Sequence, residues 1–334
     1  MIKQFLKYHP VHKKIVPNLD IIFLLRPTLF FSVWVMVVVG MYSAQMNLIK
    51  YPLWIAEFSW RTFFVFLGLT LTSASTFILN QIEDIDSDKI NNKLFLVGEY
   101  FTPESSLSIS RFLLAIGILL SAVANWFTSL FVISIYLIWG ILYNKEPYSW
   151  KKKPLLGWIA NSVVGIMLFM IGWYYVMTSQ TDVTINLYDL SIVQFMLPYI
   201  LCFSSVALLT TLPDVKGDIE TGDDTFPIIY GKMLTVILSS LLISSAFVFS
   251  LIYEDPLAST ASIVSLPFFL FTALRSLEKD ILRSIRYPIF ILNFFALTVY
   301  PWLFFPLVIT YCLSKYYYWH RFELHYPTFM VDHD

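Results

Sequence analysis

Residues 62–93, TFFVFLGLTLTSASTFILNQIEDIDSDKINNK, decide the fold class, because an apolar run over 62–80 leads directly into a segment rich in acids. About 20 apolar residues form a helix long enough to cross a bilayer. Runs of this kind recur along the 334-residue chain, in which 57% of residues are hydrophobic and 13% are charged. That charged share is about half the share usual in soluble domains. The sequence therefore predicts an all-α membrane protein and excludes a disordered chain.

Nine apolar runs predict nine transmembrane helices. They cover residues 21–44, 62–80, 107–124, 126–143, 156–177, 192–213, 233–253, 257–274 and 288–312. The last run contains Pro301 and Pro306, so it is expected either to kink or to divide into a span and a surface helix. Neither a repeat nor a soluble segment interrupts the runs. Residues 1–334 are therefore interpreted as one membrane domain, with spans from about 21 to 312.

The basic residues outside these runs predict the orientation. With the N-terminus in the cytoplasm, sixteen of them fall on the cytoplasmic side and four on the other side. Lysine and arginine favour the cytoplasmic side of a membrane protein. We therefore expect a cytoplasmic N-terminus, a C-terminus on the opposite face, and the longest polar connections on the cytoplasmic side. The first run lacks a small-residue cleavage site, so it is expected to remain in the mature protein.

Several classes of protein are disfavoured by composition. The net charge of −1 gives no basic excess for binding a nucleic acid. Cys202 and Cys312 lie far apart in apolar runs, so neither a disulfide framework nor a cysteine metal site is indicated. The five histidines lie near the two ends of the chain, away from the acidic clusters, which argues against a zinc enzyme.

Two acidic clusters follow the second and sixth runs. Asn80, Asp84 and Asp88 are spaced i, i+4, i+8, which places all three on one face of a helix, whereas Glu83 and Asp86 point elsewhere. The sixth run ends in a similar pair, Asp214 and Asp218, with Gly217 and Gly222 permitting a close approach or a turn. Both clusters are predicted at the cytoplasmic ends of their spans, where they can face one cavity.

Carboxylate and amide oxygens at such a position suit Mg²⁺, which typically binds one or two carboxylates together with substrate phosphates. We therefore predict that Asn80, Asp84, Asp88, Asp214 and Asp218 hold Mg²⁺ ions around a diphosphate. The simpler interpretation, acids that only cap helices in a solvated loop, is disfavoured because two separate helix ends carry the same spacing.

Basic residues near these acids predict a site for the diphosphate. Lys145, Lys151 and Lys153 lie in the connection between the fourth and fifth runs, and they are expected to stabilise a departing diphosphate unless they only reflect the positive-inside rule. Arg26 lies within an apolar run, where a charge is costly and often functional. The alternative interpretation of Arg26 is that its side chain reaches back to the membrane interface.

These residues resemble the motifs of the UbiA-type intramembrane prenyltransferase family. The family's first motif, Asn-x-x-x-Asp-x-x-x-Asp, is similar to Asn80, Asp84 and Asp88. Its second motif resembles the set Asp214, Gly217, Asp218, Gly222, Thr225, Pro227 and Gly231. The pair Arg26-Pro27 and the series Tyr143, Pro147, Lys151 are similar to further family features. The resemblance extends from about residue 20 to 310.

The resemblance implies nine helices around a central cavity that opens to the cytoplasmic side, with aspartates that coordinate Mg²⁺. It also implies transfer of a prenyl group from an isoprenyl diphosphate to an aromatic, quinone-precursor or lipid-like acceptor. The aspartates would act with Tyr143, which is expected to stabilise an allylic cation through its ring.

Two departures from the family pattern concern the acceptor. Relatives that prenylate aromatic acids carry a basic segment after the first motif, where this chain has the apolar KLFLVGEY over 93–100. Ser149 stands where such relatives have an arginine. A buried carboxylate needs a cationic partner. The sequence therefore predicts a neutral or lipid-like acceptor in preference to a free benzoate.

Two other functions fit parts of the pattern. A terpene cyclase on the same scaffold would use the same metal site without a second substrate. A cation transporter is disfavoured, because the acids lie at the ends of the spans and the sequence has no inverted repeat.

Overall fold

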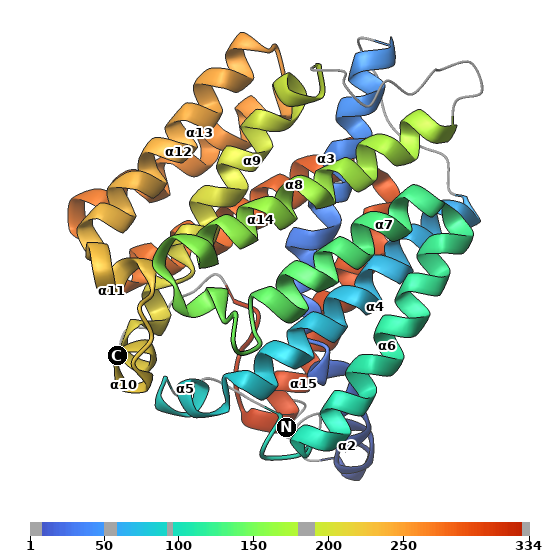
Figure 1. Ribbon diagram of the computed structural model, residues 1–334, viewed down its shortest axis with the longest axis vertical. Helices are drawn as coiled ribbons and strands as arrows, with labels where there is room; N and C mark the ends of the chain where they lie inside the picture. The colour runs from blue at the N-terminus through green and yellow to red at the C-terminus, as the bar shows by residue number, and fades with distance from the viewer. Residues whose placement is uncertain (1–8, 50–58, 92–95, 180–190, 329–334) are drawn as a thin grey trace.

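The computed structural model describes residues 9–49, 59–91, 96–179 and 191–328, and every regular element in these ranges is helical (Figure 1). The helices of the first half are α2 (Pro10–Leu24), α3 (Phe30–Ile49), α4 (Trp60–Glu83), α5 (Ile85–Ile90), α6 (Pro103–Ala124), α7 (Trp126–Ile135) and α8 (Pro154–Ser179). Those of the second half are α9 (Ser191–Leu209), α10 (Val215–Thr221), α11 (Phe226–Tyr230), α12 (Lys232–Ile252), α13 (Pro256–Arg275), α14 (Glu278–Val299) and α15 (Phe304–Phe322).

The described residues contain eight helices that are long and apolar enough to cross a membrane, and a shorter apolar helix over Trp126–Leu142. These helices lie on the nine predicted runs, so the predicted all-α membrane protein is confirmed. The boundaries of the predicted spans differ most from the helices at the two ends of the chain.

The first predicted span begins too early. Helix α2 ends at Leu24, and the backbone of Arg26 has a φ of 52°, in the left-handed region. A short 3-10 turn over Pro27–Leu29 then leads into α3. Residues 21–24 therefore belong to a separate helix, and Arg26 lies at a junction between helices instead of inside a span. Proline at the first helical position fixes the start of the new segment.

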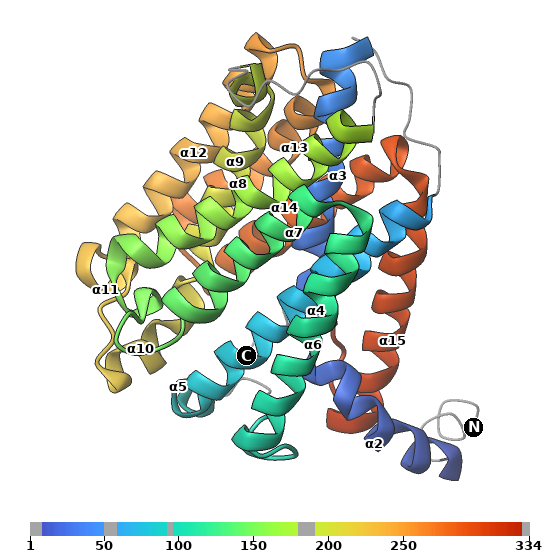
Figure 2. The same cartoon turned by 45° about the vertical axis from the view of Figure 1, so that its right-hand side comes forward.

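The last predicted span divides into two helices. α14 ends at Val299, a 3-10 turn occupies Pro301–Leu303, and α15 runs back towards α2 (Figure 2). Asp20 of α2 accepts hydrogen bonds from the Tyr317 hydroxyl at 2.6 Å and from Arg321 at 2.8 Å. The predicted placement of the C-terminal segment on the face opposite α2 is therefore wrong. The polar and aromatic composition of α15 kept most of it out of the hydropathy pattern.

Small residues allow the long helices to pack closely. Gly40 of α3 and Gly172 of α8 face each other's backbones, so that a methyl group at either position would overlap the other helix. Helices in a bilayer gain little hydrophobic energy from mutual contact, so close packing of backbones matters more than apolar burial. This contact fixes α3 against α8 beside the cavity described next.

Candidate active site

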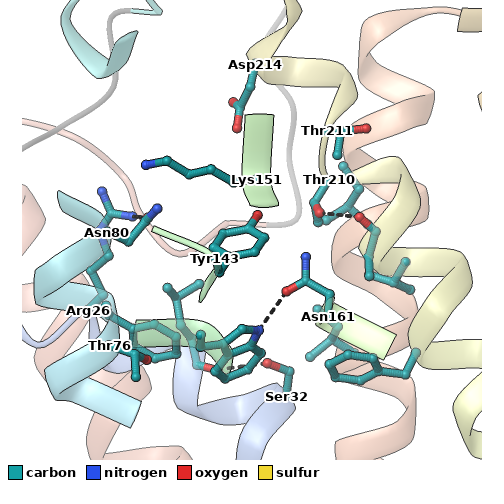
Figure 3. A pocket seen from close by; sticks show the side chains of 18 of the residues that line it. Arg26, Ser32, Thr76, Asn80, Tyr143, Lys151, Asn161, Thr210, Thr211 and Asp214 are labelled. Carbon is teal, nitrogen blue, oxygen red and sulfur yellow. Dashed lines mark hydrogen bonds between the residues drawn. The ribbon is translucent and has the colours of Figure 1, made fainter. Parts of the chain in front are cut away.

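A cavity of about 470 Å³ runs between α3, α4, α8, α9 and α14, with α5 and α10 at one end (Figure 3). Its lining changes along each helix. On α9, Tyr199 and Phe203 lie deep in the bundle and are followed by Thr210 and Thr211. The polar end is lined by Arg26, Asn80, Asp84, Asp88, Asn144, Lys151, Asp214, Asp218 and Asp223. The apolar end includes Val35, Met36, Phe77, Trp139, Phe203, Val206, Ile285, Ile289 and Leu292. The cavity thus joins a charged chamber to an apolar one.

The first motif keeps its predicted face although the helix is interrupted at Asp84. The amide of Asp84 donates to the Asn80 carbonyl at 3.0 Å, and the amide of Asp88 donates to the Asp84 carbonyl at 2.8 Å. The helical path therefore continues from α4 into α5. The Asn80 side chain also donates to Asp84 Oδ2 at 2.6 Å. As expected, the side chains of this motif line the cavity whereas Glu83 and Asp86 are exposed.

The second motif is positioned by a contact between α5 and α10 (Figure 1). The amide of Gly217 donates to Asn91 Oδ1 at 2.8 Å, and Asn91 Nδ2 donates to the Asp214 carbonyl at 3.3 Å. A side chain at Gly217 would collide with those of Asn91 and Ser87, so the predicted close approach at this glycine is confirmed. The two acidic segments face one cavity, as the spacing predicted.

Two basic side chains pair with the first motif. Arg26 donates to Asp88 Oδ2 at 3.1 Å and to Asn80 Oδ1 at 3.5 Å, while Lys151 forms an ion pair with Asp84. Arg26 therefore points to the acids and not to the membrane interface. Its left-handed backbone costs of order 1 kcal/mol or more, and strain of this kind persists where the surrounding structure enforces it.

The other two predicted lysines do not reach the cavity. The 3-10 turn Trp150–Lys152 turns Lys151 inward, whereas Lys145 and Lys153 are absent from the described lining. Lys152, which the sequence did not single out, lies 3.1 Å from Asp223, another cavity residue missed by the motifs. The hydrogen bond that Lys152 donates to Asp223 raises the pKa of Lys152 above its usual value. This pair ties the basic connection to the loop after α10.

Tyr143 lies where a π-helical segment, Tyr136–Leu142, ends. Its amide donates to the Ile138 carbonyl at 2.8 Å, five residues back. Such π segments occur frequently at functional sites, because they shift side chains relative to an α-helix. Here the segment turns Tyr143, Asn144 and Trp139 into the cavity, and Trp139 Nε1 donates to Asn161 Oδ1 at 2.8 Å (Figure 3).

The donor set fits Mg²⁺ bound together with phosphates. The described lining contains five carboxylates but only two cations, Arg26 and Lys151. Within the described ranges, no three His, Cys, Asp or Glu side chains are grouped closely enough to hold a metal ion unaided. Mg²⁺ characteristically takes few protein ligands and completes its shell with water and substrate phosphates.

Comparison with known proteins identifies the family to which this architecture belongs. The profile of the UbiA prenyltransferase family matches residues 33–295. The chain belongs to that family. Its fold resembles a UbiA homologue from Archaeoglobus fulgidus bound to GPP and Mg²⁺, with a TM-score of 0.61 at 15% identity over 88% of this chain and 99% of that one. It also resembles digeranylgeranylglyceryl phosphate synthase, with a TM-score of 0.57 at 19% identity over 86% of this chain and 97% of that one.

The sequence relatives of this chain include plant prenyl- and phytyltransferases. A 2-acyl-4-prenylphloroglucinol 6-prenyltransferase from Humulus lupulus is 28% identical over 55% of this chain and 46% of its own length. A probable homogentisate phytyltransferase 2 from Oryza sativa subsp. japonica is 28% identical over 48% of this chain and 43% of its own length. The chain therefore spans about half the length of these curated relatives.

Ser149 and the described residues of the 93–100 segment are absent from the cavity lining. Residues 93–95 fall outside the described ranges, but Leu96 and Val97 are buried against Phe23 and Leu24 of α2 and against Tyr317 of α15. Ser149 is buried with a left-handed backbone at the start of the 3-10 turn. The apolar character of 96–97 thus has a packing reason that the sequence did not show.

Proposed function

We propose that this protein transfers a prenyl group from an isoprenyl diphosphate to an acceptor within the membrane, with Mg²⁺ as its cofactor. The observation that carries this proposal is the continuity of the cavity, because one end bears the carboxylates and the other is apolar. A prenyl diphosphate has the same polarity, with an anionic head and an apolar chain.

The charge of the polar end supports the cofactor. Five carboxylates against two cations repel a diphosphate in a site of reduced dielectric. Mg²⁺ ions bound by Asn80, Asp84, Asp88, Asp214 and Asp218 would offset that negative charge and, as Lewis acids, withdraw electrons from the bond to the leaving diphosphate.

The chain's own residues have distinct roles in this proposal. Arg26 and Lys151 already lie against the acids, so they are placed to exchange a carboxylate for a diphosphate oxygen and to neutralise the leaving group. The rings of Tyr143 and Trp139 line the cavity, where they would shield an allylic cation from water and stabilise it.

The same polar end is proposed to face the cytoplasm. Of the basic residues outside the spans, sixteen lie on the predicted cytoplasmic side. Arg321, assigned from the sequence to the opposite face, lies beside Asp20 at the α2 end. Its position adds a basic residue to the predicted cytoplasmic side, so it increases the excess of lysine and arginine there on which the positive-inside rule depends.

We infer that the acceptor is a neutral aromatic or lipid-like molecule. Both cations in the described lining are paired with carboxylates, so a free benzoate would have to displace one of them. The two Humulus lupulus relatives are named for acylphloroglucinol acceptors, which are aromatic and carry no carboxylate. The Oryza sativa relative is named for homogentisate, an aromatic acid, so it does not support a neutral acceptor.

The test combines the purified protein, Mg²⁺, a prenyl diphosphate and either 4-hydroxybenzoate or an uncharged phenol, with products identified by mass spectrometry. We expect the prenylated phenol in excess. Preference for the benzoate would refute the acceptor assignment, and a cyclic hydrocarbon formed from the diphosphate alone would replace the transferase with a cyclase.

Binding provides a measurement that does not depend on turnover. The prenyl diphosphate is expected to raise the midpoint of thermal unfolding by a few degrees with Mg²⁺ and to leave it unchanged in EDTA. An equal rise in EDTA would contradict the metal assignment.

A further inference from the structure

A second cavity, of about 180 Å³, lies between α13 and α14 and shares no residue with the first. Its lining consists of Phe268, Phe271, Arg275, Asp280, Arg283 and Tyr287. The two helices pack side by side as a hairpin joined near Ser276 (Figure 1). This lining is called the α13–α14 groove below.

The buried carboxylate of Asp280 pairs with two arginines at the charged end of the groove. Asp280 Oδ1 accepts a hydrogen bond from Arg275 at 2.7 Å and lies 3.5 Å from Arg283. The Asp280 side chain is 1% exposed, whereas those of Arg275 and Arg283 are 45% and 32% exposed. The buried acid therefore neutralises one guanidinium and leaves a surplus positive charge at the surface.

The walls of the groove are aromatic. Phe268 of α13 meets Tyr287 of α14 edge to face at 4.5 Å, and Arg275 lies over the ring of Phe271 at 4.7 Å. Farther along the same hairpin the surface becomes apolar, with Val264 and Phe290 44% and 50% exposed. The groove thus changes from cationic at the helix ends to apolar towards the middle of the bundle.

This polarity matches one class of molecule. A phospholipid in the same bilayer carries an anionic phosphate at the level of the helix ends and acyl chains along the helix surfaces. Basic pockets between transmembrane helices bind such headgroups, and guanidinium forks suit phosphate oxygens. One arginine is enough to neutralise Asp280, so the second leaves a positive charge that this carboxylate does not balance.

We propose that the α13–α14 groove binds an anionic phospholipid, with its phosphate at Arg275 and Arg283 and an acyl chain along Phe271 and Phe290. The bound lipid would join α13 to α14. Other residues of α14, Ile285 and Ile289, line the main cavity, so the lipid would stabilise a wall of that cavity without touching its contents.

The test uses the full chain in neutral detergent, with thermal unfolding and native mass spectrometry in the presence of phosphatidylglycerol or phosphatidylcholine. We expect phosphatidylglycerol to raise the unfolding midpoint by about 3 °C and to remain bound in the mass spectrum. Phosphatidylcholine should do neither. An equal response to both lipids would overturn the proposal.

Three variants and a phosphate control test whether the lipid binds at the α13–α14 groove. Arg283→Gln should abolish the response to phosphatidylglycerol, whereas Lys279→Gln, with the same charge change on the same helix, should keep it. Asp280→Asn releases both arginines, so it should retain the response even if its own midpoint falls; loss of the response in this variant would show that the cluster only closes the hairpin. Inorganic phosphate alone should give no shift, and a shift equal to that of the lipid would assign the groove to free phosphate.

Discussion

Two ion pairs of the same chemical type lie in different surroundings in this protein. Arg26 holds Asp88 at 3.1 Å in the main cavity, and Arg275 holds Asp280 at 2.7 Å in the α13–α14 groove. Both carboxylates are buried, with 5% and 1% of the side chain exposed. Around the first pair carboxylates outnumber cations, and around the second pair cations outnumber carboxylates. We therefore expect the surplus charge, and not the pair itself, to decide whether each site takes a cation or an anion.

The largest expected effect concerns the surplus carboxylates. Asp84→Asn or Asp214→Asn removes a charged side chain from the proposed Mg²⁺ ligand set, so turnover should fall about a thousandfold or more, while the protein still folds. Product formation by mass spectrometry measures the loss, and size-exclusion chromatography in detergent checks the fold.

Glu83→Gln and Asp86→Asn are the matched controls, because both side chains are exposed and lie outside the cavity. They should lower turnover less than threefold. If Glu83→Gln proved as damaging as Asp84→Asn, the assignment of a single acidic face to catalysis would be wrong.

The next effect distinguishes the two ion pairs. Arg26→Gln leaves Asp88 buried without its guanidinium, which should destabilise the protein by about 3 kcal/mol. Arg275→Gln should cost less, because Arg283 remains 3.5 Å from Asp280. Midpoints of thermal unfolding compare the two variants. Adding Asp88→Asn to Arg26→Gln should recover much of the loss; no recovery would mean that Arg26 stabilises the protein through contacts other than its ion pair with Asp88.

The sequence predicted the parts of the site that depend on local spacing. The i, i+4 separations placed Asn80, Asp84 and Asp88 on one face, and the run lengths located the helices. Gly217 was correctly expected to permit a close approach. The spacing and the run lengths follow from the geometry of a helix. At Gly217 the absence of a side chain predicted a close approach, but not its partner, Asn91, which is 126 residues away in the chain.

The parts that depend on distant segments could not be predicted in this way. Asn91 bridges α5 and α10, and Asp223 reaches Lys152, through contacts that no local pattern encodes. The return of α15 to α2 depends on Asp20 pairing with Arg321, which is 301 residues later in the chain. The division of the last run at its prolines was one of the two expected outcomes. A hydropathy window detects apolar residues, so it did not include the second half of α15, which is rich in tyrosine and basic residues.

A smaller effect is expected where the two acidic segments meet. Gly217→Ala would press a methyl group on the Asn91 amide and on the Ser87 hydroxyl, so Asn91 must move and weaken its bonds to α10. The cost should be about 1–2 kcal/mol. A double-mutant cycle with Asn91→Ala, read by thermal unfolding, tests the contact. If the two changes simply add, the methyl group does not act through Asn91.

The smallest expected effect concerns Lys152 and Asp223, the pair that ties the basic connection to the loop after α10. The Lys152 side chain is 40% exposed, so solvent screens the pair, and Lys152→Gln should cost less than about 1 kcal/mol. Because the bond to Asp223 raises the pKa of Lys152, its contribution should be complete below the unfolded-state pKa of about 10.4 and should disappear as the pH rises through the higher folded-state pKa. The free energies of unfolding of Lys152→Gln and of the unsubstituted protein, determined at pH 7, 9 and 11, measure this contribution. A difference in unfolding free energy between the two proteins that is constant from pH 7 to 9 and becomes smaller at pH 11 supports the pair. A difference that already becomes smaller between pH 7 and 9 would mean that Lys152 titrates below its usual range, because burial outweighs the effect of the carboxylate.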